Sequence, residues 1–295
     1  MSNPPRIMVN AGNPKISVIT PNYNGAKTLR ETIQSVLNQG YPALEHIVVD
    51  GGSTDGSLEI LREYPHILWT SGKDAGHFDA MNKGVARATG ELIVILNSDD
   101  CFRPGALASV AGAFGQHPEW DASFGDAVYV DGEGDEIYRR EEAVYDYNVL
   151  RYWNDYICHQ TLFVRKPVYE RIGGYKHQDL KYCCDFEFIL RLGREGCVVG
   201  HVRAYLVNFR FHAGGLSGDR ELEQRMRQET LRIREQYGFP GGLWGGILAN
   251  GYRAKRQLQK LRYRGACDLI SGRSLLKKHL REKAGVSSRT TIDGR

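Results

Sequence analysis

Short runs of apolar and β-branched residues alternate along the first third of the chain with segments whose apolar residues recur at helical spacing. The runs are typical of buried strands, and the spaced segments are typical of amphipathic helices. Strands are predicted at 16–20, 46–49, 67–69 and 92–96, and helices at 28–39, 55–64 and 75–88. Strands that alternate with helices form a parallel sheet covered on both faces. The pattern therefore predicts the α/β class, with a single Rossmann-like, mostly parallel sheet flanked by helices.

The pattern is less regular in the remainder of the chain, and no internal repeat is visible. Helices are predicted at 104–114, 183–194 and 221–236, and strands at 122–130, 157–165 and 198–207. The 295 residues, 41% of them hydrophobic, are enough for one large domain with a smaller appendage. We expect a flexible leader at 1–14, the main domain at 15–218, a basic helical extension at 219–285 and a flexible tail at 286–295.

Nothing in the sequence predicts export or a membrane span. No segment reaches the roughly 18 consecutive apolar residues of a spanning helix. Met1–Pro14 has no apolar centre of the kind that secretory signals carry. The six cysteines match neither a zinc site nor a disulfide framework. We therefore expect reduced thiols and a cytoplasmic location.

Polar clusters follow three of the predicted strands. They are Thr20–Asn24, Asp50–Ser53 and Asn97–Asp100. Ligands of parallel sheets bind beyond the carboxyl ends of the strands. The three clusters are therefore expected to converge on one crevice.

Two adjacent carboxylates, Asp99 and Asp100, stand at the mouth of an apolar strand. Such a pair suits a hard divalent cation, Mg²⁺ or Mn²⁺, which keeps coordination positions open for phosphate oxygens. The alternative is that one of the two caps the following helix. Asp100 is suited to this, which leaves Asp99 as the better metal ligand.

The loop Asp50–Gly56 is rich in glycine and joins a strand to a helix. A carboxylate at the strand end can accept a hydrogen bond from the ring N–H of a nucleobase, and glycine lets the backbone approach a ligand closely. An ordinary turn, with Ser53 or Asp55 as helix N-cap, explains the same residues. Both interpretations stay open on this loop alone.

Several motifs in a fixed order resemble family 2 glycosyltransferases with the GT-A fold. They are Ile19–Asn24 (ITPNYN), Val48–Gly56 (VVDGGSTDG), Lys73–Gly76 (KDAG), Asp79–Gly84 (DAMNKG), Leu96–Asp100 (LNSDD), His159–Gln160, Ile172–Tyr175 (IGGY), Asp185–Glu187 and Gly214–Ser217 (GGLS). The resemblance covers residues 15–218, and its specificity comes from the number of motifs in register. It implies a GT-A catalytic domain that transfers a sugar from a nucleotide diphosphate with inversion, using one divalent metal ion.

The resemblance implies a donor site at the strand ends. Pro21 and Tyr23 would flank the nucleobase, and Asp50 would bind its ring nitrogen. Asp99 matches the last acid of the family's metal-binding Asp-x-Asp. Asn97 stands where the first acid is expected, which removes one charge.

Further donor contacts are expected around these residues. The full expected set is Thr20, Pro21, Tyr23, Asp50, Gly52, Asp79, Asn82, Lys83, Asn97 and Ser98. An ion pair between Asp79 and Lys83, one helical turn apart, is the alternative for those two. His212 is expected as a metal ligand or phosphate donor, although a histidine near a glycine turn is also common as a structural residue.

Transfer by a single displacement needs a base that deprotonates the acceptor hydroxyl. Asp185 matches the family's catalytic acid, and Cys184 replaces the acidic residue that often precedes it. The alternative for Asp185 is a simple helix cap, and Glu187 is the second candidate base. His159 and Gln160 are expected to line the acceptor or sugar pocket.

The end of the chain is strongly basic. From Gly241 to Arg295 it carries 13 Lys and Arg against 3 acids, a net charge of +10, whereas the rest carries −6. A basic amphipathic segment beside an aromatic anchor suits an anionic membrane surface. It would hold the protein peripherally at the inner face of the cell membrane, near a lipid-linked acceptor. The alternative is a helical hairpin packed on the catalytic domain. No nucleic-acid partner is expected, since no such module is recognisable.

These observations together predict an inverting, metal-dependent hexosyl- or N-acetylhexosaminyltransferase of surface polysaccharide synthesis. The expected donor is a UDP-sugar, the acceptor a glycan or lipid-linked glycan, and the cofactor Mg²⁺ or Mn²⁺. A sugar nucleotidylyltransferase would carry a glycine-rich loop with Arg and Lys after the first strand, and none is present. The alternative from another class is a catalytically silent nucleotide-binding subunit that recruits a partner to the membrane. The presence of both Asp99 and Asp185 favours an active enzyme over a catalytically silent subunit.

Overall fold

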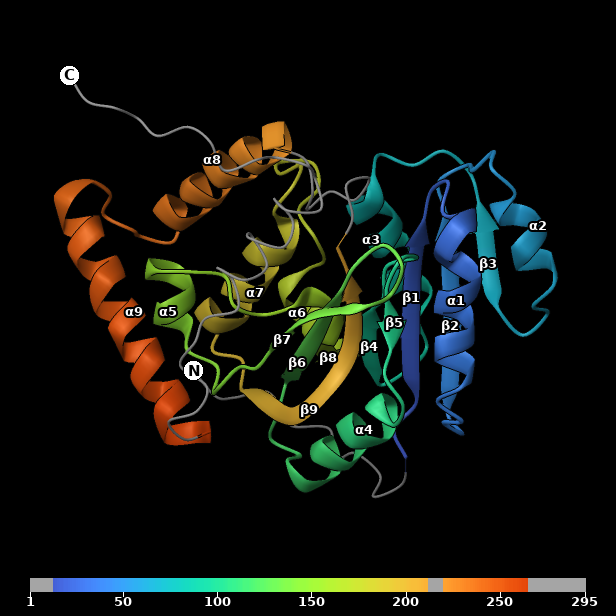
Figure 1. Ribbon diagram of the computed structural model, residues 1–295, viewed down its shortest axis with the longest axis horizontal. Helices are drawn as coiled ribbons and strands as arrows, with labels where there is room; N and C mark the ends of the chain where they lie inside the picture. The colour runs from blue at the N-terminus through green and yellow to red at the C-terminus, as the bar shows by residue number, and fades with distance from the viewer. Residues whose placement is uncertain (1–12, 212–219, 265–295) are drawn as a thin grey trace.

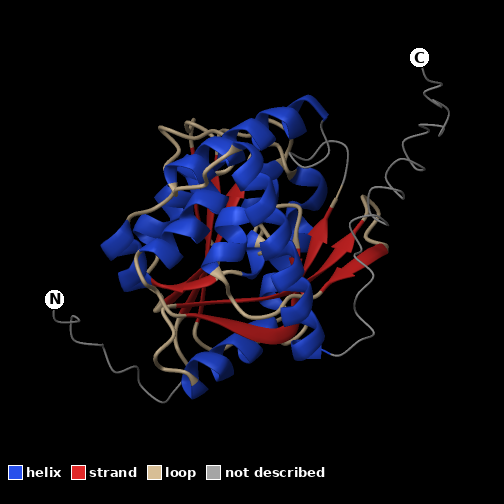
Figure 2. Ribbon diagram, turned by 90° about the vertical axis from the view of Figure 1, so that its left-hand side faces the viewer, coloured by secondary structure: helices blue, strands red, loops and turns tan. Residues whose placement is uncertain are grey.

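A sheet runs through the centre of the protein, with helices on both of its faces (Figures 1 and 2). The structure is a computed structural model that describes residues 13–211 and 220–264. Within these residues the sheet has nine strands in the order β3-β2-β1-β4-β8-β6-β9-β5, and β7 pairs with β6. Most of the paired residues lie in parallel ladders. The predicted α/β class and mostly parallel sheet are confirmed.

The N-terminal half of the sheet is parallel throughout. It consists of β1 (Ile16–Asn22), β2 (Leu44–Asp50), β3 (Leu68–Ser71) and β4 (Leu92–Ile95). Helices α1 (Ala26–Leu37), α2 (Ser57–Arg62) and α3 (His77–Arg87) connect these strands. Each of these elements was predicted, with ends displaced by a few residues. Because the strands are parallel, their carboxyl ends meet at one edge of the sheet.

The second half of the sheet is mixed. Its strands are β5 (Cys101–Phe102), β6 (Ala122–Val130), β7 (Glu136–Arg140), β8 (Phe163–Arg165) and β9 (Val199–Arg210), and its helices are α4 (Ala106–Gln116), α5 (Tyr147–Tyr152), α6 (Lys166–Ile172) and α7 (Cys184–Arg194). Strand β8 is antiparallel to both β4 and β6, whereas β6 and β9 are parallel. The short elements β5, β7, α5 and α6 were not predicted, because each is too short for a clear period.

The predicted strand at 157–165 is wrong over most of its length. The hydroxyl and the backbone N–H of Thr161 both donate to the Cys158 carbonyl, at 2.7 and 2.9 Å. These bonds close a single 3₁₀ turn, η1 (His159–Thr161), and only β8 remains as strand. A buried turn whose polar groups bond locally has the same apolar composition as a strand.

Helix α8 (Arg220–Gln236) belongs to the same core as the sheet. Ile233, on α8, and Tyr237, just after it, are buried in one cluster with residues of α3 and α7. The predicted boundary at 218 lies outside the described residues, and part of the predicted extension contributes to the core.

The predicted basic extension is helical as far as the structure describes it. Helix α9 (Gly242–Arg264) lies beside α5 at one edge of the molecule (Figure 1). No helix in the described ranges is long and apolar enough to cross a membrane. His212, most of the predicted leader, the end of the extension and the predicted tail lie outside the described residues.

Candidate active site

The loops after β1 and β2 are tied together by hydrogen bonds. Asn22, the last residue of β1, donates from Nδ2 to Asp50 Oδ1 at 2.8 Å. The backbone N–H of Asn24 donates to Ser53 Oγ at 2.8 Å. The backbone N–H of Thr54 in turn donates to Asn24 Oδ1 at 2.9 Å. The predicted convergence of these two strand ends is confirmed.

The Asp50 carboxylate is buried and holds its loop together. It accepts hydrogen bonds from Asn22, from the backbone N–H groups of Gly52 and Ser53, and from the hydroxyls of Ser53 and Ser71. Burial alone would raise the pKa of Asp50. The bonds from Ser53 and Ser71 outweigh burial and hold this pKa below its usual range. These bonds organise the loop in this structure, and the predicted contact of Asp50 to a nucleobase stays a prediction.

The side chains of Thr20 and Pro21 are buried within β1, and the donor contacts predicted for these two residues stay predictions. Thr20 Oγ1 lies 3.0 Å from His46 Nε2, inside the sheet. Side chains of a central strand point into the helical layers that cover the sheet and not into a crevice at its edge. Tyr23, just past the end of β1, is 69% exposed and remains available to a ligand.

A narrow gap lies between the Tyr23 ring and Asp74. A Cβ added to Gly51 would stand 2.9 Å from Asp74 Oδ2 and 3.3 Å from Tyr23 Cδ2. Glycine at this position therefore keeps the gap between an aromatic face and a carboxylate open. Gly52, the next residue, has φ +87°, a conformation that other residues rarely adopt.

Helix α3 carries Asp79 and Lys83 as an ion pair. Their Oδ2 and Nζ atoms are 2.8 Å apart, one helical turn from each other. Asp79 also accepts a hydrogen bond from the backbone N–H of Ala75 at 3.0 Å. The alternative that the sequence left open for these two residues is the arrangement that the structure contains.

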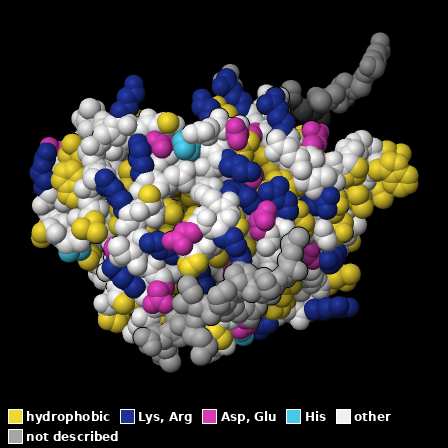
Figure 3. Space-filling model, turned by 180° about the vertical axis from the view of Figure 1, so that it is seen from behind, with side chains coloured by type: hydrophobic (Ala, Val, Ile, Leu, Met, Phe, Trp, Pro, Cys, Tyr) yellow, Lys and Arg dark blue, Asp and Glu magenta, His cyan; other side chains and the backbone are white. Residues whose placement is uncertain are grey.

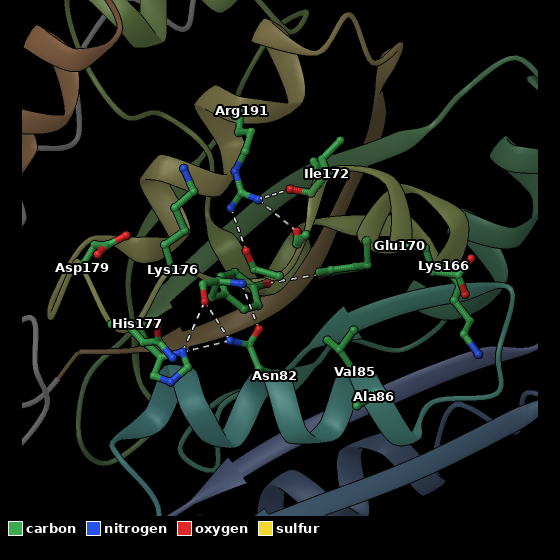
Figure 4. Close-up of a pocket in the computed structure, with 15 residues that line it drawn as sticks. Asn82, Val85, Ala86, Lys166, Glu170, Ile172, Lys176, His177, Asp179 and Arg191 are labelled. Carbon is green, nitrogen blue, oxygen red and sulfur yellow. Dashed lines mark hydrogen bonds between the residues drawn. The ribbon is translucent and has the colours of Figure 1, made fainter. Parts of the chain in front are cut away.

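Asn82 binds the loop after α6 and does not face the strand ends. Its Nδ2 donates to the Tyr175 carbonyl at 2.7 Å, and its Oδ1 accepts from the Tyr175 backbone N–H at 2.8 Å. Figure 4 shows the amide pointing from α3 into this loop, beside His177, at the wall of a cavity of about 710 Å³. The Asn82 amide is thus held by the loop after α6, and its predicted donor contact stays a prediction.

The loop after β4 places Asp99 and Asp100 differently. Asp100 is buried, and its two oxygens accept from the Arg210 backbone N–H and from Gln160 Nε2, both at 2.8 Å. It caps no helix, since α4 begins after Gly105. Asp99, like Asn97 and Ser98, is only half-buried. Asp99 is thus the carboxylate of this pair that lies nearer to solvent.

The donor set at this loop fits a hard divalent cation. Magnesium is usually bound by one or two carboxylates together with substrate phosphates, and Asp99 supplies one such carboxylate. Burial, together with the neighbouring Asp99 charge, raises the pKa of Asp100. Among the described residues no group of three or more His, Cys, Asp or Glu could hold a metal. The expected ligand His212 lies outside them.

The η1 turn orients two side chains in opposite directions. Gln160 reaches Asp100, while His159 Nε2 lies 2.7 Å from the Tyr175 hydroxyl. Burial lowers the pKa of His159 to about 4, so the ring is neutral near pH 7. Both side chains are more than nine-tenths buried. Both side chains bind other protein groups in this structure, and their predicted place in an acceptor or sugar pocket stays a prediction.

Asp185 lies in the first turn of α7. The residue at the N-cap is Cys183, which makes no side-chain capping bond, and Asp185 Oδ1 accepts from the Phe186 backbone N–H at 2.8 Å. The side chain is half-buried, and burial raises the pKa of its carboxyl to about 6. A carboxylate with a raised pKa near neutrality suits a general base.

Glu187, the second candidate base, is occupied by other partners. It is buried and pairs with Arg191 at 2.8 Å and with Lys176 at 3.0 Å, and it accepts from the Tyr237 hydroxyl at 2.7 Å. Burial alone would raise the pKa of Glu187. These partners outweigh burial and keep this pKa below its usual range. Glu187 is therefore a structural ion-pair partner, which leaves Asp185 as the candidate base.

Hydrogen-bond contacts lead from the loop that bears Asp99 and Asp100 as far as Tyr175. Asp100 contacts Gln160, and the adjacent His159 contacts Tyr175. Burial, then Tyr169, then the Asp185 charge raise the pKa of Tyr175, so Asp185 lies near enough to influence it. The contacts end at Tyr175, and the link from there to Asp185 is electrostatic.

The sequence model described as glycosyl transferase family 2 matches residues 17–185, more than half of the chain. This chain belongs to glycosyl transferase family 2. A PGL/p-HBAD biosynthesis glycosyltransferase of Mycobacterium tuberculosis is 31% identical over 233 residues, which cover 75% of this chain and 88% of that relative. TuaG of Bacillus subtilis, named provisionally as a teichuronic acid biosynthesis glycosyltransferase, is 38% identical over 100 residues. These residues cover 32% of this chain and 39% of TuaG.

Two solved structures show that this family 2 glycosyltransferase has the GT-A fold. Staphylococcus aureus TarS 1–349 in complex with UDP superposes with a TM-score of 0.58 at 18% identity, covering 92% of this chain and 78% of that one. The mannosyltransferase PcManGT from Pyrobaculum calidifontis, in complex with GDP-Man and Mn²⁺, has a TM-score of 0.54 at 22% identity, covering 97% and 80%.

Three residues that support the site of this glycosyltransferase were not among the predicted site residues. They are Arg210, which donates to the Asp99 carbonyl at 3.1 Å, Tyr175, which contacts His159, and Glu229 of α8, which accepts from three backbone N–H groups before Asp185. Arg210 and Glu229 act across long sequence separations and offered no local signal, whereas Tyr175 closes the Ile172–Tyr175 motif.

Proposed function

We propose that this glycosyltransferase moves a hexosyl or N-acetylhexosaminyl group, with inversion, from a nucleotide diphosphate sugar to a hydroxyl of a glycan or lipid-linked acceptor. The observation that carries the proposal is Asp185, a half-buried carboxylate in the first turn of α7 with a pKa raised to about 6. Hydrogen bonds link Gln160 to Asp100 and His159 to Tyr175. The Asp185 charge, after burial and Tyr169, raises the pKa of Tyr175.

The donor nucleotide is proposed to lie over the ends of β1 and β2. The exposed Tyr23 ring and Asp74, on either side of Gly51, offer a stacking surface and a hydrogen-bond acceptor for a nucleobase. A UDP-sugar is the proposed donor. Solved neighbours in complex with UDP and with GDP-Man support a nucleotide sugar of one of these two kinds.

A divalent cation, Mg²⁺ or Mn²⁺, is proposed to be held by Asp99, with His212 as a further ligand. When bound, it would neutralise charge on the leaving diphosphate. The backbone of Asp99 is fixed by Arg210, whose Nε donates to its carbonyl. Arg210 also pairs with Glu31 at 2.6 Å, which anchors the loop to α1.

Asp185 is proposed to remove the proton from the acceptor hydroxyl as that oxygen attacks the sugar from the face opposite the diphosphate. The carboxylate takes the proton, and the glycosidic bond to the diphosphate breaks as the new one forms. The neutral His159 holds the Tyr175 hydroxyl on the other side of Asp185. This contact keeps the region next to the base ordered.

The cellular setting of the reaction is proposed from the relatives. Their names assign them to PGL/p-HBAD biosynthesis and, provisionally, to teichuronic acid biosynthesis. These names support a role in the synthesis of a polysaccharide or glycolipid. We place the enzyme in the cytoplasm, peripherally at the inner face of the cell membrane.

Calorimetric titration of UDP, GDP and dTDP into the purified chain, with and without Mn²⁺, tests the donor site. We expect one nucleotide to bind in a metal-dependent manner, with binding lost in Asp99→Ala and retained in Asp185→Ala. Asp185→Ala should nevertheless lose sugar transfer. If a folded sample binds no nucleotide with metal present, the donor site is elsewhere; if both variants transfer sugar normally, the assigned roles are wrong.

A further inference from the structure

Helix α9 packs on the protein with a polar face. Arg256 is 1% exposed, and its Nη2 pairs with the buried Glu142 at 2.7 Å while its guanidinium lies 3.7 Å from the centre of the Tyr156 ring. Lys260 pairs with the same Glu142 at 3.2 Å. Gln259 donates to Asp146 at 2.7 Å. Ion pairs and hydrogen bonds, not an apolar stripe, therefore hold α9 in place.

The opposite face of α9 is apolar and exposed. Leu243, Trp244, Ile247 and Leu258 are 81, 71, 52 and 55% exposed. With the exposed Ala254, the leucines and the isoleucine share one stripe at helical spacing. In Figure 3, hydrophobic side chains project from the edge of the molecule on which α9 lies. A surface helix of a globular protein normally turns such a stripe toward the core. In α9 the apolar stripe faces solvent instead.

The charges around the stripe identify a partner. Every charged residue of α9 is Lys or Arg, and the exposed Arg253, Lys255 and Arg262 lie along the helix beside the apolar stripe. A second copy of the chain docked on this face would bring two all-basic helices together, which is unfavourable. An apolar stripe flanked by cations instead complements an anionic bilayer, whose headgroups attract Lys and Arg.

We propose that the outward face of α9 lies in the interface of an anionic bilayer, with Leu243, Trp244 and Ile247 among the acyl chains and Arg253 and Arg262 at the headgroups. No described helix can span the membrane, so α9 would lie along the surface. This inference deepens the proposed function, because it would hold the enzyme next to a lipid-linked acceptor. It concerns binding alone and does not require that the donor site be correctly assigned.

Flotation of the full chain with lipid vesicles tests the inference. We expect binding to vesicles of phosphatidylcholine and phosphatidylglycerol in equal parts, and little to phosphatidylcholine alone. Leu243→Ser with Trp244→Ser should weaken binding about tenfold or more. Arg253→Glu with Arg262→Glu should weaken it at least about fivefold for each charge. The matched controls Leu231→Ser and Arg232→Glu, exposed positions on α8, should bind as the unaltered chain does.

Fluorescence gives a second readout that needs no loss of binding. Emission of the unaltered chain should shift to shorter wavelength with anionic vesicles, and the shift should disappear in Trp244→Phe although the vesicles still bind. Equal binding of the α9 variants and the α8 controls would overturn the inference, as would no binding to anionic vesicles. Self-association that the α9 variants abolish, without vesicle binding, would overturn it in favour of a second copy. Nucleotide titration of the same samples separates these outcomes from failure of the proposed function.

Discussion

At the residue scale, four carboxylates, two near strand ends and two in the first turn of α7, differ in what surrounds them. Asp50 and Glu187 accept several hydrogen bonds or ion pairs, and each has a lowered pKa. Asp100 is buried between Gln160 and the backbone of β9, and its pKa is raised. Asp185 combines partial exposure with a raised pKa. Environments that separate the pKa values of carboxylates indicate which of them act in proton transfer.

The raised pKa of Asp185 predicts an acid limit to the reaction. A general base works only when it is ionised, so transfer should be constant above pH 7 and fall about tenfold per pH unit below about 6. Asp185→Asn should lower the turnover number about 100- to 10,000-fold. The variant should stay folded, because the amide removes a charge that burial disfavours. Turnover measured from pH 5 to 8 at saturating donor, with thermal melting of both proteins, checks this; an unchanged profile in Asp185→Asn would exclude Asp185 as the base.

At the element scale, helix α8 fixes the segment that leads into the candidate base. The Glu229 carboxylate accepts from the backbone N–H groups of Lys181, Tyr182 and Cys183 at 2.8, 2.7 and 2.7 Å. These groups precede α7, and Asp185 follows two residues later. The Glu229 charge also contributes to the raised pKa of Asp185, after burial. Glu229 therefore acts as a positioning residue through both geometry and charge.

Substitution of Glu229 should separate these two contributions. Glu229→Gln keeps an oxygen acceptor but removes the charge, so the acid limit of turnover should move to lower pH. Glu229→Ala should in addition reduce turnover several-fold, because three backbone N–H groups lose their acceptor. The Michaelis constant for the donor should change little in either variant. Pure loss of stability would leave the pH profile in place, and that result would exclude the electrostatic role. Gln228→Ala, an exposed neighbour on the same helix, is the matched control.

At the scale of the whole molecule, the sequence predicted the parallel half of the sheet and the convergence of its strand ends. Those features depend on local periodicity and on the polar residues after each strand. It did not predict that Asn82 and Gln160 would serve as internal contacts, because their partners Tyr175 and Asp100 lie 93 and 60 residues away. The sequence could not decide between a packed and a membrane-bound tail, because α9 has both a packed polar face and an exposed apolar face.

The attachment of α9 depends on a buried cluster of charged residues that are far apart in the sequence. Glu142, next to β7, faces Arg140, Lys260 and Arg256. Burial alone would raise the pKa of Glu142, but these cations hold it below the usual range. Arg256 lies 114 residues from Glu142 and also donates to the Val144 carbonyl at 2.7 Å. Removing one partner of a buried ion pair leaves the other poorly compensated.

Arg256→Ala should therefore lower the free energy of unfolding by about 3 to 5 kcal/mol and release α9 from the body. The matched control is Arg253→Ala, three residues earlier on the exposed face, which should change stability by no more than about 0.5 kcal/mol. Urea unfolding measures the stability, and brief tryptic digestion measures release through faster cleavage within α9. Equal stability and equal cleavage of Arg256→Ala and Arg253→Ala would show that the ion cluster does not hold α9, and that the apolar contacts of Tyr252 on Tyr152, with ring centres 4.9 Å apart, suffice.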